Sequence, residues 1–198
     1  MPPGKKSAFL LFDAEGNLTN LRDSAPAIAS SLQAEYEIES VSRAAPAHGL
    51  WIGQPTGPRL HRTDFLQRIA QATLFHHATH FDFSPSGGFK SSIRLADESG
   101  LMVADVLTLP RVPRYVTLFG CNTARTSEEV GGQEVLGLTQ TFLFKGSAWV
   151  VGTARKVDDK LAARIAKSFF SHLDASAPNP HQALRQAIAE THISPADY

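Results

Sequence analysis

Residues 114–122 read Arg-Tyr-Val-Thr-Leu-Phe-Gly-Cys-Asn and carry a strong strand signal. The run 114–119 is β-branched, aromatic and almost wholly apolar, which is typical of a strand covered on both faces. It ends at Gly120, where the backbone can turn sharply, and Cys121 follows at the carboxyl end of the strand. The stretch therefore predicts a buried sheet that presents a thiol at one edge.

Strands and helices alternate along the rest of the chain. Short apolar or alternating runs predict strands, and apolar residues at helical spacing predict helices. We expect further strands at residues 7–12, 36–41, 73–78 and 148–151, and a small hairpin at 92–95 and 101–103. Expected helices cover residues 24–34, 64–70, 104–109, 132–145, 157–173 and 181–191, and loops cover 44–58, 81–90 and 122–131. This order predicts an α/β fold with a mostly parallel sheet and helices on both faces, in a single domain over residues 1–198.

Cap and stop signals indicate where several helices begin and end. Ser24 and Thr63 are candidate N-caps, with Pro26 near the start of the first helix, and Gly146 is expected to end the helix before it. The last two helices are each expected to bury one stripe of residues. The stripes contain Leu161, Ile165, Ser168, Phe169 and His172 in the first, and Ala183, Leu184, Ala187 and Ile188 in the second.

Composition and charge exclude several classes of protein. Of the 198 residues, 42% are apolar and 19 basic residues balance 19 acidic ones, which argues against a polybasic nucleic-acid clamp and against disorder. No run approaches the roughly 18 apolar residues of a membrane span, and the first apolar run is too short for a signal peptide. The single cysteine excludes an intrachain disulfide framework and a multi-cysteine zinc module. We therefore expect a cytoplasmic protein that binds neither nucleic acid nor a membrane.

Two predicted strands are followed by side chains that suit nucleophilic catalysis. His80 follows the strand 73–78, and Cys121 follows the strand 114–119. Active sites in sheets of this class form at the carboxyl ends of the strands. If the two strands are neighbours, an imidazole and a thiol lie side by side, and such an imidazole activates a thiol as a nucleophile. The alternative for Cys121 is a small buried apolar side chain.

Histidines cluster at positions 76, 77 and 80, and His76 and His80 have the spacing that binds zinc on a helix. The segment is predicted to be a strand, in which residues four apart lie about 13 Å from each other, too far to share a metal ion. We therefore expect no metal and no other cofactor. His76 and His77 are expected to be hydrogen-bonded core residues, and only His80 is placed for catalysis.

Four motifs in order resemble the landmarks of the CHAT domain, a caspase-like peptidase domain that is often attached to TPR repeats and is related to caspases and separases. The motifs are Leu-Phe-His-His-Ala-Thr-His at 74–80, Leu-Phe-Gly-Cys-Asn-Thr-Ala at 118–124, Gly-Gly-Gln-Glu-Val-Leu-Gly-Leu at 131–138 and Lys-Val-Asp-Asp at 156–159. The resemblance extends over about residues 8 to 192 and implies a caspase-type fold.

The resemblance also implies a Cys–His dyad, with Cys121 as the nucleophile and His80 as the base that later protonates the leaving amine. The implied oxyanion donors are the backbone N–H groups of Cys121 and Phe81. Phe81 stands where the family usually has Gly, so its side chain needs room and a permitted φ. Gly120 and Asn122 replace the commoner Ala and Glu beside the cysteine.

Candidate specificity residues come from the Val-Asp-Asp motif and from two arginines. Asp158 and Asp159 open a predicted helix, where acidic side chains complement the helix dipole. In separase-like relatives a carboxylate lines a pocket for a basic P1 residue, and we assign that role to Asp158. Arg125 and Arg155 would instead favour an acidic P1 residue.

These observations together predict a cysteine endopeptidase that hydrolyses peptide bonds in a protein substrate. The alternatives are a catalytically inactive caspase-like interaction module and another Cys–His hydrolase such as an amidase, because a fold does not fix a function. The loops 81–90 and 122–131 flank the predicted dyad and offer little apolar anchorage. We expect low basal activity, with these loops ordered by substrate, by a regulatory partner or by a fused domain of the TPR type.

Overall fold

A five-stranded parallel sheet forms the centre of the fold. The computed structural model describes residues 5–13, 17–42, 62–82, 84, 90–95, 100–121, 123 and 137–192. The strands of this sheet are β1 (Lys6–Phe12), β2 (Tyr36–Ser42), β3 (Leu74–Ala78), β7 (Tyr115–Leu118) and β8 (Trp149–Gly152), in the order β2-β1-β3-β7-β8. Their bounds agree with the predicted strands to within one residue at each end.

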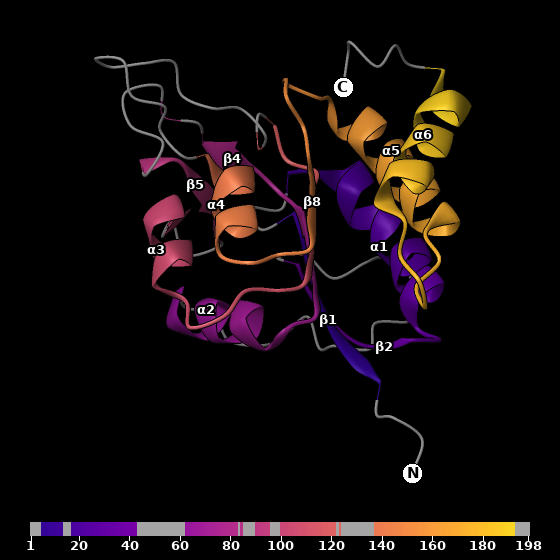
Figure 1. The fold of residues 1–198 in the computed structure, drawn as a ribbon. Helices are drawn as coiled ribbons and strands as arrows, with labels where there is room; N and C mark the ends of the chain where they lie inside the picture. Colours follow the sequence, from indigo (N-terminus) through magenta and orange to yellow (C-terminus); the bar gives the residue numbers. More distant parts are fainter. Residues whose placement is uncertain are drawn as a thin grey trace.

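Helices cover both faces of this sheet (Figure 1). On one face lie α1 (Thr19–Leu32), α5 (Asp159–His172) and α6 (Pro180–Thr191), and on the other lie α2 (Arg62–Gln71), α3 (Val103–Thr108) and α4 (Leu138–Phe144). Successive strand residues enter opposite apolar cores, as Leu10 and Leu11 do in β1. The predicted α/β class is therefore confirmed. None of the described helices is long and apolar enough to cross a membrane.

A small antiparallel sheet follows β3. It consists of β4 (Phe81–Asp82), β5 (Ser92–Arg94) and β6 (Gly100–Met102), in that order. The β5–β6 hairpin confirms its prediction, whereas the prediction of a loop at residues 81 and 82 is wrong. Phe81 pairs with Ile93 and is buried in the core beneath α2, α3 and α4, so one apolar side chain anchors a segment that is otherwise polar. The predicted loop 44–58, residue 83, residues 85–89 and residues 124–136 lie outside the described residues.

Several predicted helix ends need correction. Ser24 does not cap α1, which begins at Thr19; it is buried inside the helix, where its hydroxyl donates to the Leu21 carbonyl at 2.5 Å. Pro26 accordingly lies within α1 rather than near its start. Thr63 is likewise inside α2, which begins one residue earlier. Gly146 does end α4, with a φ of 106°.

The buried faces of α5 and α6 are rotated from the predicted stripes. Leu161, Ser168 and His172 were expected to be buried and are only partly so. The buried face of α5 consists of Ala162, Ala163, Ile165, Ala166, Phe169 and Phe170. The reason is that α5 packs against α6 as well as the sheet: His172 Nε2 lies 2.7 Å from Glu190 of α6, and Ser168 donates to the same carboxylate. In α6 the buried residues are Ala183, Ala187 and Thr191, while Leu184 and Ile188 are half-buried.

Candidate active site

The two strands that precede His80 and Cys121 are neighbours in the sheet, as predicted. β3 and β7 pair in parallel, with His77 opposite Leu118 as the last pair. The contact continues past the strands, because the Phe119 N–H donates to the His77 carbonyl at 2.7 Å. His80 and Cys121 each follow their last paired residue by three positions at the carboxyl edge of the sheet.

Gly120 lies against the segment that leads to His80. A Cβ on Gly120 would stand 2.5 Å from His77 Cε1 and 2.7 Å from the Thr79 carbonyl oxygen, both far inside contact distance. Glycine is therefore required here by a close approach between two segments, and its φ lies outside the left-handed region. The residues that immediately precede Cys121 and His80 are in direct contact.

His80 is half-buried and is held from two sides. Its ring Nε2 lies 2.8 Å from Asn17 Oδ1, and its backbone carbonyl accepts the Arg94 N–H at 3.0 Å. Asn17 stands just before α1, close to the end of β1. Sequence reasoning did not find this contact, because Asn17 follows Gly16 after a strand and is typical of a turn residue.

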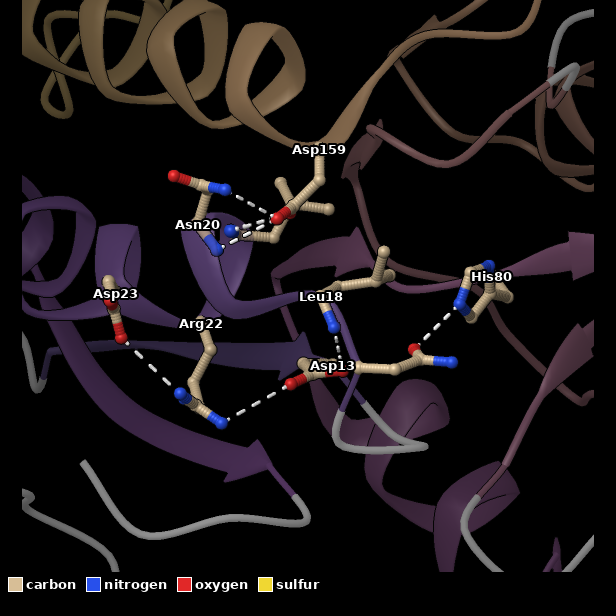
Figure 2. A network of polar contacts seen from close by, with 9 residues as sticks. Asp13, Leu18, Asn20, Arg22, Asp23, His80 and Asp159 are labelled. Carbon is tan, nitrogen blue, oxygen red and sulfur yellow. Dashed lines mark hydrogen bonds and ion pairs between the residues drawn. The ribbon is translucent and has the colours of Figure 1, made fainter. Parts of the chain in front are cut away.

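The start of α1 beside His80 is fixed by a buried carboxylate (Figure 2). Asp13 is fully buried, and its Oδ1 accepts the Leu18 N–H at 2.7 Å. Its Oδ2 lies 3.6 Å from Nη1 of Arg22. Its own N–H donates to the Ala78 carbonyl at 3.0 Å, and its φ is 41°. The unusual backbone at Asp13 thus joins the ends of β1 and β3 to the first turn of α1.

Cys121 is partly exposed, and its thiol contacts the segment before α5. The Sγ atom donates to the Val157 carbonyl with an S···O distance of 3.4 Å. The backbone around Cys121 is held by two fully buried threonines. Thr123 Oγ1 donates to the Leu118 carbonyl at 2.7 Å and accepts the Thr153 N–H at 3.0 Å.

Asp158 and Asp159 cap two different helices. Asp158 is the N-cap of its own helix, α5, and accepts the Leu161 N–H at 2.9 Å. Asp159 instead accepts the backbone N–H groups of Asn20 and Leu21 at 2.9 Å, together with the Asn20 side-chain amide at 2.8 Å (Figure 2). Sequence reasoning anticipated acids at a helix start but not that one of them serves α1, which is distant in sequence.

The remaining candidate residues around the site are placed as follows. Phe81 stands where the family usually has Gly. Its side chain lies in the core and its φ is outside the left-handed region, so the side chain has both the room and the permitted backbone conformation that it needs. Arg155 is exposed between β8 and α5. Asn122 and Arg125 lie outside the described residues.

His76 and His77 are core residues on opposite faces of β3. Burial lowers the pKa of each ring to about 3, so both are neutral near pH 7. His76 Nδ1 lies 2.8 Å from Thr117 Oγ1, which confirms the expected hydrogen bond. His77 is buried as expected, and its ring interacts with the backbone of His80, which opposes the effect of burial on its pKa, although neither ring nitrogen meets strict hydrogen-bond geometry among the described residues. In the part of the chain that the structure describes, no three potential metal ligands come together.

The parallel sheet, its two layers of helices and the paired strand ends define a caspase-like α/β protein. The fold is similar to a chain of the crystal structure of the Saccharomyces cerevisiae separase–securin complex, with a TM-score of 0.62 and 15% sequence identity. The likeness covers 96% of this chain but 11% of that chain, so this sequence spans about a tenth of the length of the separase-complex chain. A search of curated proteins finds no match.

The family follows from the sequence. The model of the CHAT domain matches residues 10–195, so the chain belongs to the CHAT domain family. This confirms the resemblance drawn from the four motifs.

Proposed function

We propose that the protein is a cysteine endopeptidase in which Cys121 is the nucleophile and His80 the general base. One observation carries the proposal: the two side chains follow adjacent parallel strands at equivalent positions, and the residues before them are in contact at Gly120 and Thr79. A thiol beside an imidazole at the carboxyl edge of such a sheet suits nucleophilic attack on a peptide carbonyl.

The proposed reaction has two halves. His80 takes the proton of the Cys121 thiol, and the thiolate sulfur attacks the scissile carbonyl carbon. The C–N bond breaks as His80 returns this proton to the leaving amine, which leaves a thioester on Cys121. A water molecule then gives a proton to His80 while its oxygen bonds to the thioester carbon. The C–S bond breaks, the carboxylic acid departs and the thiol regains its proton.

The oxyanion of each intermediate needs hydrogen-bond donors at a fixed place. We assign this role to the backbone N–H groups of Cys121 and Phe81. The burial of the Phe81 side chain in the core supports the assignment, because the side chain is accommodated away from solvent while the backbone N–H is retained.

For substrate recognition we assign Asp158 to a basic P1 residue. Its exposed carboxylate lies next to Val157, whose carbonyl accepts the Cys121 thiol, so a charge that binds substrate would stand close to the nucleophile. An acidic P1 residue bound by the exposed Arg155 is the competing arrangement. We further propose that the substrate is a protein and that a regulatory partner or fused domain controls activity.

A noncatalytic interaction module is the second candidate, and one observation favours it. The Cys121 thiol donates its proton to the Val157 carbonyl, so in this arrangement the proton is bound by that carbonyl and not by His80. Catalysis therefore requires the thiol to exchange this acceptor for His80.

Incubation with a proteome-derived peptide library tests the proposal, with new amino termini identified by mass spectrometry. We expect cleavage after basic residues by the wild type, and none by Cys121→Ala or His80→Ala. His181→Ala, at an exposed position on α6, is the matched control and should cleave like the wild type. Cleavage that persists in Cys121→Ala contradicts the proposal. Cleavage after acidic residues would show that Arg155, and not Asp158, binds the P1 residue.

A further inference from the structure

The structure assigns Asn17 as the residue that positions the His80 ring, an inference that rests on the proposed function. The contact is the 2.8 Å separation between Asn17 Oδ1 and His80 Nε2, and it joins the start of α1 to the end of β3. We propose that this contact fixes both the orientation and the tautomer of the imidazole.

The chemistry of the two groups decides which ring nitrogen acts as the base. An amide oxygen can only accept a hydrogen bond, so the nitrogen that faces it must carry the proton. In the neutral ring Nε2 is therefore N–H, and Nδ1 holds the lone pair. The Cys121 proton moves to Nδ1, while the Nε2 proton stays in its bond to Asn17 throughout the reaction.

A neutral amide partner suits a group that must also release its proton. The imidazolium formed after proton transfer is stabilised by the amide dipole at Nε2. A carboxylate there would hold the imidazolium more strongly and weaken it as an acid toward the leaving amine. Asn17 therefore orients the ring without removing its ability to protonate the amine.

Asn17 is held in place by carboxylates from two other parts of the fold. Asp13 accepts the N–H of Leu18, the residue that directly follows Asn17. Asp159 accepts the N–H groups of Asn20 and Leu21 (Figure 2). Asp159 lies two residues after Val157, whose carbonyl accepts the Cys121 thiol. The helix end that presents Asn17 to His80 is thus tied to the segment that contacts the nucleophile.

Cys121 is the only cysteine of the chain, so the rate of alkylation by iodoacetamide reports on this one thiol without a known substrate. At pH 7 we expect His80→Ala to react about tenfold more slowly than the wild type, because the thiolate loses its partner. Asn17→Ala should slow the alkylation of Cys121 by most of the same factor. Asn17→Asp keeps a hydrogen-bond acceptor and should restore the wild-type rate. Asn20→Ala alters the same helix turn without a contact to His80 and should react like the wild type.

Histidine tautomers measured by ¹⁵N NMR supply a second readout that needs no substitution. In the neutral His80 ring of the wild type, we expect protonated Nε2 and unprotonated Nδ1. A His80 ring with the proton on Nδ1 would overturn the inference. A merely structural role of Asn17 predicts no change of tautomer in Asn17→Ala, whereas we expect a mixture.

The alkylation rates separate the two proposals. If His80→Ala reacts slowly but Asn17→Ala reacts like the wild type, Asn17 is not a positioning residue and the dyad stands. If His80→Ala reacts like the wild type, the proposed dyad itself fails. If Asn20→Ala slows the reaction as much as Asn17→Ala, the effect comes from the helix start in general and the assignment of Asn17 is wrong.

Discussion

The His77 ring fills the place that a side chain at position 120 would occupy. The CHAT domain commonly has Ala at the position of Gly120, but here the His77 ring and the Thr79 carbonyl occupy the place of a Cβ. Because the contact includes backbone of the segment that carries His80, a larger residue at 120 acts on the distance between the two candidate catalytic side chains.

Gly120→Ala is expected to lower both stability and reactivity. The forced separation of the two segments should cost about 1–3 kcal/mol of unfolding free energy, as overpacking usually does. The substitution should also slow the alkylation of Cys121. Urea denaturation measures the loss of stability, and the iodoacetamide reaction measures the loss of reactivity. Gly146→Ala is the control, since Gly146 has open space and a φ of 106°, so it loses stability through backbone strain away from the site. Unchanged alkylation in Gly120→Ala would show that the contact does not set the site.

The candidate dyad could be predicted from sequence, but its supporting residues could not. Cys121 and His80 are recognisable because each follows an apolar strand, and strand ends meet at one edge of a parallel sheet. Asn17 and Asp159 act on partners that are distant in the sequence. No local pattern distinguishes them from a turn residue and a helix-start acid.

The start of α1 depends on side chains outside the helix. Its N-cap residue, Leu18, makes no side-chain capping hydrogen bond, and Asp13 and Asp159 accept the first N–H groups instead. This explains why α1 begins before Ser24, the predicted cap. Two carboxylates at a helix start also complement its dipole.

Asp159→Ala is expected to destabilise the contact between α5 and α1. The Asn20 and Leu21 N–H groups would lose their acceptor, which should cost about 0.5–2 kcal/mol of unfolding free energy. Hydrogen exchange should increase at these two amides. In Asp158→Ala the exchange should increase at Leu161 of α5 instead, because that carboxylate caps its own helix. Equal exchange at Asn20 in both variants would contradict the separate roles.

The elements that sequence predicted best are the central strands. β1, β3 and β7 are covered on both faces, so β1 and β7 are largely apolar runs. β3 is buried along its whole length although it contains His76 and His77. β4 was missed because its pairing depends on the single apolar contact of Phe81 with a strand eleven residues later. The faces of α5 were misjudged since a helix that packs against two neighbours does not bury a single stripe.

The stability of the protein should fall in mild acid because of His76 and His77. Burial holds the pKa of each ring at about 3, below the ordinary 6.5, so between these values the unfolded chain binds protons that the folded chain does not. Their contribution is fully present above about pH 6.5 and falls by up to about 1.4 kcal/mol per pH unit for each ring below it. Urea denaturation at several pH values measures the slope.

His76→Leu should reduce this slope by the share of one ring, even though it leaves Thr117 Oγ1 without its partner and lowers stability at neutral pH. His181→Gln, at an exposed position, should leave the slope unchanged. An unfolding free energy that is equal at pH 7.5 and pH 5 would show that the two rings are not neutral in the folded protein.

The proposed function requires that His80 make Cys121 a nucleophile toward peptides. Its most direct test is covalent labelling by peptidyl acyloxymethyl ketones with a basic or an acidic P1 residue, followed by intact mass and adduct mapping. We expect one adduct on Cys121 of the folded wild type, formed faster with the basic peptide, and little or none in His80→Ala or in urea. Labelling of His80→Ala at the wild-type rate would contradict it, because the thiol would then react without the imidazole.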